Sequence, residues 1–359
     1  ARVEVAADNT LKETTKNTGH WAWKLQDGSL KLLTGDVRFK DVIFGCLIIV
    51  YIISFYKLIN LKGKLKIKDI VMEILLIILI ILFRNNGFHI VLLSLLFLLF
   101  LGRQNIFKYI IIICITITFY YSYNNVILPH FKITNGSIRE VLSVPFQQTA
   151  RYVKEYKKEV TSDEKKAIDK LLNYDTIASR YNPALADPVK NEFNRYYTDN
   201  DLKNYFKVWF TQLKKHPLVY VEATIANTYG YIYPVETNWY VHIKGKKIIN
   251  NYGFDYHFNK KLRPLRMVLG GFAIAFPYIP FIGLLINIGF NTWILLFMLS
   301  YLFYRKKYKD IILLIPSFLI LLVCFVSPAN TYFRYALPNV FALPLMLLMF
   351  DKIISKKDK

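Results

Sequence analysis

Two arginines beside apolar runs are the residues of this sequence best suited to chemistry. Arg84 stands between the runs 70–82 and 88–101, and Arg334 precedes a third run near the C-terminus. A guanidinium at a helix end near lipid headgroups offers a planar fork that fits a phosphate or pyrophosphate. The alternative reading is that both side chains only reach back to the membrane surface.

Two further side chains have the chemistry of a catalyst. Asp41 precedes an apolar run, where a carboxylate could orient or deprotonate an acceptor hydroxyl. It could equally be a helix-start charge favoured by the macrodipole. His216 precedes Pro217 and is either a catalyst or a helix-terminal histidine. The donor-binding residues predicted on the same outer membrane face are Lys40, Arg84, Asn85, Asn86, Arg334 and Tyr335.

The signatures of soluble enzymes are missing from the sequence. It has no Gly-rich phosphate loop, no nucleophile elbow and no paired Cys or His at metal-ligand spacing. No cofactor and no metal site are predicted, and a divalent-metal requirement stays open. The net charge is +22, but the lysines cluster beside apolar runs, where they indicate topology and contact with anionic headgroups. We therefore predict a lipid bilayer partner and no nucleic acid.

The elements that must position these residues are membrane helices. Hydrophobic residues make up 54% of the chain, and apolar runs alternate with lysine-rich turns. This pattern predicts an all-α membrane protein, a polytopic helical bundle with a large extracytoplasmic α-rich loop domain. The runs around Arg84 predict two short or tilted helices joined by a tight polar turn, and about six full spans are expected in all.

Lysine distribution predicts the organisation of the chain in a plasma membrane, with the large loop outside and the C-terminus in the cytoplasm. The chain begins at Ala1, and we expect it to be a piece of something longer. The predicted parts are an N-terminal extracytoplasmic segment, truncated or foreign (1–40), four transmembrane helices (41–128), the extracytoplasmic loop domain (129–264), a re-entrant or interfacial helix plus C-terminal transmembrane helices (265–350), and a cytoplasmic basic tail (351–359).

Local patterns refine this picture. Pro277 and Pro280 predict that 265–279 is an interfacial or half-inserted helix and that 282–304 is the true span. In the loop domain, helices are predicted at 163–173 and 199–215, and the aromatic stretch 218–240 is predicted to rest at headgroup level. Glu73, inside the second span, is predicted to reach the interface or to pair with a lysine.

Six short motifs carry a resemblance to an uncharacterised family of bacterial multi-pass membrane proteins, over about residues 40–350. They are Lys40-Asp41-Val42-Ile43-Phe44, Phe83-Arg84-Asn85-Asn86-Gly87, Val144-Pro145-Phe146-Gln147-Gln148-Thr149-Ala150-Arg151, Asp187-Pro188-Val189-Lys190, Lys215-His216-Pro217 and Phe333-Arg334-Tyr335-Ala336-Leu337-Pro338. More distantly, the hairpin with its arginine turn and the closing Arg-Tyr before an apolar span resemble C-type membrane glycosyltransferases.

The second resemblance implies that Arg84 and Arg334 face a polyprenyl-phosphate-linked sugar donor at the outer leaflet, with Asp41 beside it. The implied activity is glycosyl transfer to a glycan or glycolipid acceptor of the cell envelope. Such enzymes carry their principal catalytic acid in an N-terminal membrane half that this chain does not contain. Whether the chain is an enzyme by itself is therefore left open. The alternatives are a polysaccharide polymerase or ligase, and a non-enzymatic transporter or scaffold.

Overall fold

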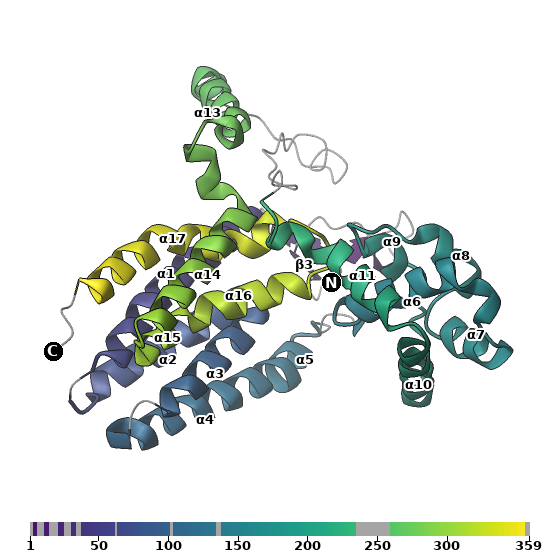
Figure 1. Cartoon of the computed structure of the whole chain (residues 1–359), viewed down its shortest axis with the longest axis horizontal. Coiled ribbons are helices and arrows are strands. Elements are labelled where there is room, and N and C mark those ends of the chain that lie inside the picture. Colours follow the sequence, from purple (N-terminus) through teal and green to yellow (C-terminus); the bar gives the residue numbers. More distant parts are fainter. Residues whose placement is uncertain are drawn as a thin grey trace.

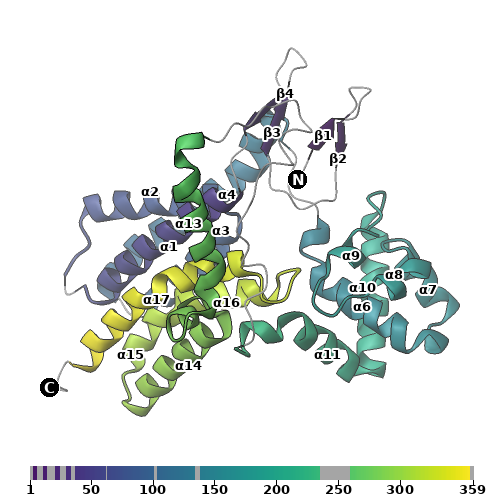
Figure 2. The same ribbon diagram turned by 90° about the horizontal axis from the view of Figure 1, so that it is seen from above.

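The structure is a computed structural model, which describes residues 3–5, 11–13, 21–24, 30–33, 37–61, 63–100, 103–133, 138–234 and 259–355. From Val37 on, its regular elements are helices, which confirms the predicted all-α membrane protein. The helices form two groups: a bundle of long apolar helices and a compact group, α6 to α11, beside one end of the bundle (Figures 1 and 2). Parts of the predicted N-terminal segment, of the loop domain (235–258) and of the basic tail (356–359) lie outside the described residues.

The bundle is built from apolar helices of two lengths. Among the described residues, four helices are long and apolar enough to cross a membrane, rather than the expected six or so: Lys40–Ile59, Ile106–His130, Tyr308–Phe325 and Phe333–Ile354. Two shorter apolar helices, Asn86–Leu99 and Ile288–Tyr304, reach only about 21–26 Å at 1.5 Å per residue. The bundle helices are α1 (Val37–Ile59), α2 (Ile67–Phe83), α3 (Asn86–Leu99), α4 (Ile106–Ser122), α5 (Leu128–His130), α14 (Ile288–Tyr304), α15 (Tyr308–Ile311), α16 (Ile315–Phe325) and α17 (Phe333–Ile354).

Helix α1 lies at the centre of the bundle, packed against α17 and α2. One stripe of its side chains is fully buried, with exposed fractions of 2% or less: Phe44, Ile48, Tyr51, Ile52 and Phe55. This spacing of three and four residues places all five on one face of a helix. Gly45 lets α17 approach closely, because a Cβ there would lie 2.9 Å from the Phe341 ring.

The loop domain folds around its own apolar core, which includes Phe146, Ile168, Leu172 and Tyr205. Thr161 and Thr198 cap α7 and α10 through capping boxes. The predicted helix 199–215 is confirmed, whereas the helix predicted at 163–173 ends at Asp169. The headgroup prediction for 218–240 is wrong for Tyr220 and Tyr231, which are buried in protein. The helices are α6 (Ser143–Glu155), α7 (Ser162–Asp169), α8 (Tyr174–Arg180), α9 (Asp187–Lys190), α10 (Asp199–Lys215) and α11 (Pro217–Thr228).

Helix α13 (Arg263–Ala275) stands apart from the bundle in Figure 1. It is too short to cross a membrane, and the chain turns through Pro277 and Pro280 before α14 begins at Ile288. The regular helix of the predicted span 282–304 thus starts six residues late. The apolar side chains of α13 that are more than half exposed are Leu265, Met267, Val268, Leu269, Phe272 and Ile274.

Two short antiparallel hairpins precede α1. The first pairs β1 (Val3–Val5) with β2 (Leu11–Glu13), and the second pairs β3 (Trp21–Lys24) with β4 (Leu30–Leu33). No strands were predicted for this segment.

The connection between α16 and α17 is buried between the bundle and the loop domain. Ser327, Ala329, Asn330 and Thr331 are each exposed by 3% or less. Its backbone pairs with the loop domain: the Ala186 N–H donates to the Pro328 carbonyl at 2.7 Å, and the Asn330 N–H donates to the Ala184 carbonyl at 2.9 Å. Buried peptide groups need such partners, so the loop domain completes this end of the bundle.

Tyr231 supplies the second set of contacts to this connection. Its hydroxyl donates to the Ala329 carbonyl at 2.8 Å and accepts the Tyr332 N–H at 3.0 Å. Burial raises the pKa of Tyr231, so the hydroxyl stays a neutral donor. Because the Tyr332 N–H is bound in this way, the first residue of α17 has a defined position relative to the loop domain.

Thr331 has a backbone conformation that threonine rarely adopts. Its φ is 52°, in the left-handed region that costs a β-branched residue about 1–2 kcal/mol. Gly230 lies directly against it, and a Cβ on Gly230 would overlap the Thr331 Cγ2. The close contact therefore requires glycine at position 230, and Thr331 keeps its strained backbone conformation.

We expect Gly230→Ala to destabilise the folded chain by about 1–3 kcal/mol, because the added methyl overpacks a buried contact. Thermal unfolding of the purified protein in detergent measures the effect. Gly271→Ala is the matched control, since a Cβ at Gly271 meets no heavy atom within 4 Å. The double variant Gly230→Ala/Thr331→Gly should recover most of the loss, and an unchanged Tm for Gly230→Ala would contradict this account of the contact.

Candidate functional site

Five of the predicted site residues meet where the start of α1, the α2–α3 turn and the start of α17 come together. Arg84 is at the centre: its Nη1 lies 3.5 Å from Asp41 Oδ1 and donates to the Arg334 carbonyl at 3.2 Å. Lys40 lies within electrostatic range of both arginines and of Asp41. Tyr335 contacts both guanidinium groups. We call these five residues, Lys40, Asp41, Arg84, Arg334 and Tyr335, the rim cluster.

The α2–α3 turn aims Arg84 into the bundle rim. Arg84 caps α2 in an extended conformation, with φ −151° and ψ 127°, and its carbonyl accepts the Gly87 N–H at 2.8 Å. The turn is so tight that a Cβ on Gly87 would lie 2.6 Å from Ile80 Cγ2 and 2.9 Å from the Ile80 carbonyl oxygen. Glycine is therefore needed here for the close approach of α3 to α2.

Arg84 joins three helices through one guanidinium. Besides Asp41 on α1 and the Arg334 carbonyl on α17, its Cζ lies 4.8 Å from the Tyr335 ring centroid and 5.5 Å from that of Phe44. Asp41 is 3% exposed, so this ion pair is shielded from water. A desolvated pair of this kind is stronger than a surface one, and loss of one partner leaves a buried charge.

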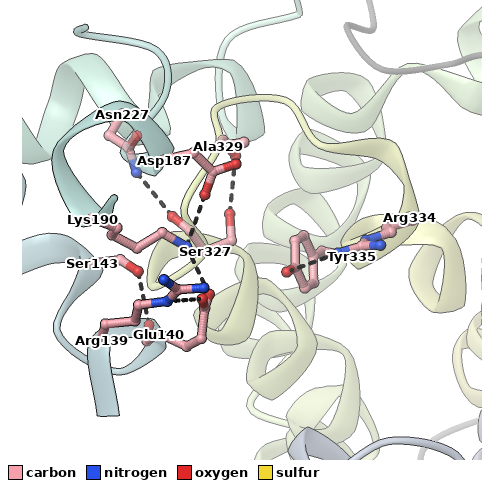
Figure 3. Close-up of polar contacts among 10 residues, drawn as sticks. All are labelled: Arg139, Glu140, Ser143, Asp187, Lys190, Asn227, Ser327, Ala329, Arg334 and Tyr335. Atoms are coloured by element: carbon pink, nitrogen blue, oxygen red, sulfur yellow. Dashed lines mark hydrogen bonds and ion pairs between the residues drawn. The ribbon is translucent and has the colours of Figure 1, made fainter. Parts of the chain in front are cut away.

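Arg334 is surrounded by aromatic rings. Its Cζ lies 4.6 Å from the Tyr332 ring centroid and 5.2 Å from that of Tyr335, and its Nη2 donates to the Tyr335 hydroxyl at 3.4 Å (Figure 3). Its Nε is buried and makes no hydrogen bond to any described residue. In the described part of the chain, no carboxylate lies within 4 Å of Arg334.

The charge balance of the rim cluster favours an anion. Three cations, Lys40, Arg84 and Arg334, surround the carboxylate of Asp41. A partly desolvated arginine with unused N–H donors is the side chain best suited to hold a phosphate. Over the residues that the structure describes, no group of three or more His, Cys, Asp or Glu is placed to hold a metal ion.

The other predicted site residues, Asn85, Asn86 and His216, are not part of the rim cluster. Asn85 is exposed and Asn86 half-buried in the same turn as Arg84, and neither has a side-chain hydrogen bond to the rim cluster. His216 lies in the loop domain, where it joins α10 to α11. Its Nε2 lies 2.7 Å from Glu159 Oε2, and its ring stacks on Tyr156 at 3.8 Å. The structure does not bring His216 to the rim cluster.

A second charged group at the rim was not among the predicted site residues. Lys190 is buried, and its Nζ lies 2.7 Å from Glu140 Oε2 and 2.8 Å from Asp187 Oδ1 (Figure 3). Asp187 and Asp41 both lie within electrostatic range of Tyr332, whose pKa is raised mainly by burial. The sequence does single out this group, because Asp187-Pro188-Val189-Lys190 is one of the motifs that carry the family resemblance. The motif alone, however, predicts no role for Lys190.

Comparison with known proteins identifies a family and no function. Residues 36–359 match the model of a family described as "Family of unknown function (DUF6020)". The match leaves out the two hairpins, which end at Leu33. No curated protein and no solved structure matches the chain.

The ion pair of Glu140 with Lys190, both in the loop domain, makes the stability of that domain sensitive to acid. Burial by itself would raise its pKa, but the Lys190 ammonium and the Arg139 guanidinium hold the pKa below its ordinary value of 4.5. A carboxyl with a lowered folded-state pKa stabilises the fold above the unfolded value, and the contribution is lost as the pH falls through the lower one.

We therefore expect Glu140→Gln to lower the Tm at neutral pH, and the difference from the wild type to shrink as the pH falls below about 4.5. Thermal unfolding over a pH series measures it. Asp163→Asn, at an exposed surface pair with Lys166, is the matched control and should show little effect. A difference that persists undiminished in acid would contradict the assignment.

Proposed function

The chain belongs to a family of unknown function, and we propose that it binds a polyprenyl-phosphate-linked sugar donor at the rim cluster. On this proposal the sugar is transferred to a hydroxyl of a cell-envelope glycan or glycolipid. The protein contributes by position and charge: it holds the phosphate, places the anomeric carbon and presents the acceptor to an acid.

The observation that carries this proposal is the environment of the Arg334 guanidinium. The flat faces of its guanidinium are covered by Tyr332 and Tyr335, its Nε has no partner among the described residues, and Arg84 lies beside it. Desolvating a cation in this way costs free energy, which an anionic ligand offsets. A lipid phosphate fits because both arginines stand at the ends of apolar helices, where the polyprenyl chain can enter the bilayer.

Asp41 is the proposed acid–base residue. It is the one carboxylate of the rim cluster, and it lies 3.5 Å from Arg84. In the transfer, the acceptor oxygen bonds to the anomeric carbon as the bond from that carbon to the phosphate oxygen breaks. The acceptor proton goes to Asp41, and the phosphate keeps the bonding electrons next to the arginines.

The proposed orientation puts the rim cluster and the loop domain outside the plasma membrane and the C-terminus in the cytoplasm. Lysines at the opposite end of the bundle support it: Lys64 and Lys66 precede α2, and Lys306 and Lys307 follow α14. Helix α13, with its exposed apolar side chains and the basic turn at Lys260–Leu262, would then lie along the outer headgroup region.

We expect a polyprenyl phosphate to raise the Tm of the purified protein, and the same polyprenol without its phosphate to do so much less. A ligand at 100 times its Kd stabilises the fold by about 2.7 kcal/mol. Arg334→Ala should remove the shift, and Arg334→Lys should reduce it, because a point charge does not replace the guanidinium fork. The Tm without ligand checks that each variant folds.

Arg180→Ala is the matched control, since Arg180 is a surface residue of the loop domain paired with Glu192 at 3.2 Å. Asp41→Asn should keep the lipid-dependent shift but lose transfer of sugar in reconstituted vesicles. An Arg334→Ala protein with an unchanged phosphate-dependent shift would remove the proposed site. Transfer from a lipid-linked preassembled glycan, and not from a single-sugar donor, would favour the polymerase or ligase alternative.

The orientation is tested separately with single cysteines and a membrane-impermeant maleimide on intact cells. Tyr196 is 94% exposed in the loop domain, so Tyr196→Cys should be labelled from outside. Lys64→Cys, in the α1–α2 connection, should be labelled only after the membrane is permeabilised. The reverse pattern would place the rim cluster at the cytoplasmic face.

A further inference from the structure

Glu73 lies inside the bundle, about 9 Å along α2 from its first residue, Ile67. It is 3% exposed, whereas Val71 and Met72 beside it in the sequence are 49% and 59% exposed. The prediction that Glu73 reaches the interface or pairs with a lysine is wrong, because its side chain faces the protein interior. Arg84 is eleven residues further along the same helix, so Glu73 is separate from the rim cluster.

The carboxyl of Glu73 has one hydrogen-bond partner. Ser54 on α1 donates its hydroxyl to Glu73 Oε2, while Oε1 is buried and has no partner among the described residues. No Lys, Arg or His of the described chain forms an ion pair with it. The polar groups near it on the helices packed against α2 are Ser54 and Tyr51 on α1 and Tyr109 on α4, and Ser94 on α3 lies against Tyr51.

An ionised carboxylate is costly in this position. Moving such a charge from water into an apolar interior costs several kcal/mol even after relaxation, and a single hydroxyl bond does not offset that. A buried acid without a cation therefore takes up a proton. In the neutral form, the carboxyl needs fewer partners and gains an O–H donor.

We propose that Glu73, with Ser54 against it, is an intramembrane proton-binding site in which the carboxyl is protonated at neutral pH. The bound species is the proton alone. Because Ser54 belongs to α1 and Glu73 to α2, loss of the proton would leave a charge between two packed helices. Proton release is thereby tied to a change in the packing of α1 against α2.

Dicyclohexylcarbodiimide, a hydrophobic reagent that reacts with protonated carboxyl groups, tests the site on the full chain in lipid vesicles. The acid proton moves to one carbodiimide nitrogen while the carboxyl oxygen bonds to the central carbon. The acyl group then migrates to nitrogen, and the product retains every atom of both reactants. Peptide mass spectrometry near neutral pH should find one added carbodiimide on Glu73 and none on Asp69, an exposed acid on the same helix. Glu73→Gln should abolish the adduct.

A second measurement does not depend on whether the reagent reaches the site. If the folded chain holds a proton that the unfolded chain releases, the wild type loses stability relative to Glu73→Gln as the pH rises from about 5 to about 9. The difference in Tm between the two proteins should therefore widen in favour of the glutamine variant. Asp69→Asn is the matched control and should show a constant difference. A constant difference for Glu73→Gln overturns the proposal, whatever the labelling result.

Discussion

Buried peptide groups must find hydrogen-bond partners, and this requirement shapes the end of the bundle that carries the arginines. The connection between α16 and α17 is too irregular to satisfy its own backbone. Residues 184–186 and Tyr231, both from the loop domain side, supply the missing partners. The start of α17, and with it Arg334, is thus located by a part of the chain that lies more than 100 residues earlier in the sequence.

Tyr335 of the rim cluster and the neighbouring Tyr332 resolve a conflict between burial and charge at Arg334. A guanidinium is weakly hydrated at its flat faces and strongly hydrogen-bonding at its edge. Tyr332 and Tyr335 cover the faces of Arg334, where cation–π attraction is worth about 0.5–2 kcal/mol. The edge carries the directional bonds: its Nη2 donates to the Tyr335 hydroxyl, and its Nε has no partner among the described residues. The same division holds for Arg84, whose edge is occupied by Asp41 and by a carbonyl.

Features that depend on local sequence were predictable. The caps at Thr161 and Thr198, the breaks at proline and the tight turn at Arg84 each follow from a few neighbouring residues. The membrane class followed from composition. Among the candidate site residues, those at helix ends next to apolar runs were found because a charge beside a membrane span is costly and often marks a functional site.

Features that depend on which helices pack together were not predictable. Glu73 could face lipid, water or protein, and only its meeting with Ser54 on α1 decides between them. Tyr231 read as one of many aromatic residues, although its hydroxyl contacts a connection about 100 residues away. Lys190 had no predicted role, because its contacts with Glu140 and Asp187 depend on how the loop domain packs.

The hydrogen bond from Arg84 Nη1 to the Arg334 carbonyl has a mechanical consequence. An incoming anion that takes this N–H must displace an internal acceptor that ties α2 to α17. Anion binding at this N–H therefore competes with the tie between α2 and α17. If the site binds an anion as proposed, release of that anion lets the N–H return to the Arg334 carbonyl and re-form the tie between the two helices.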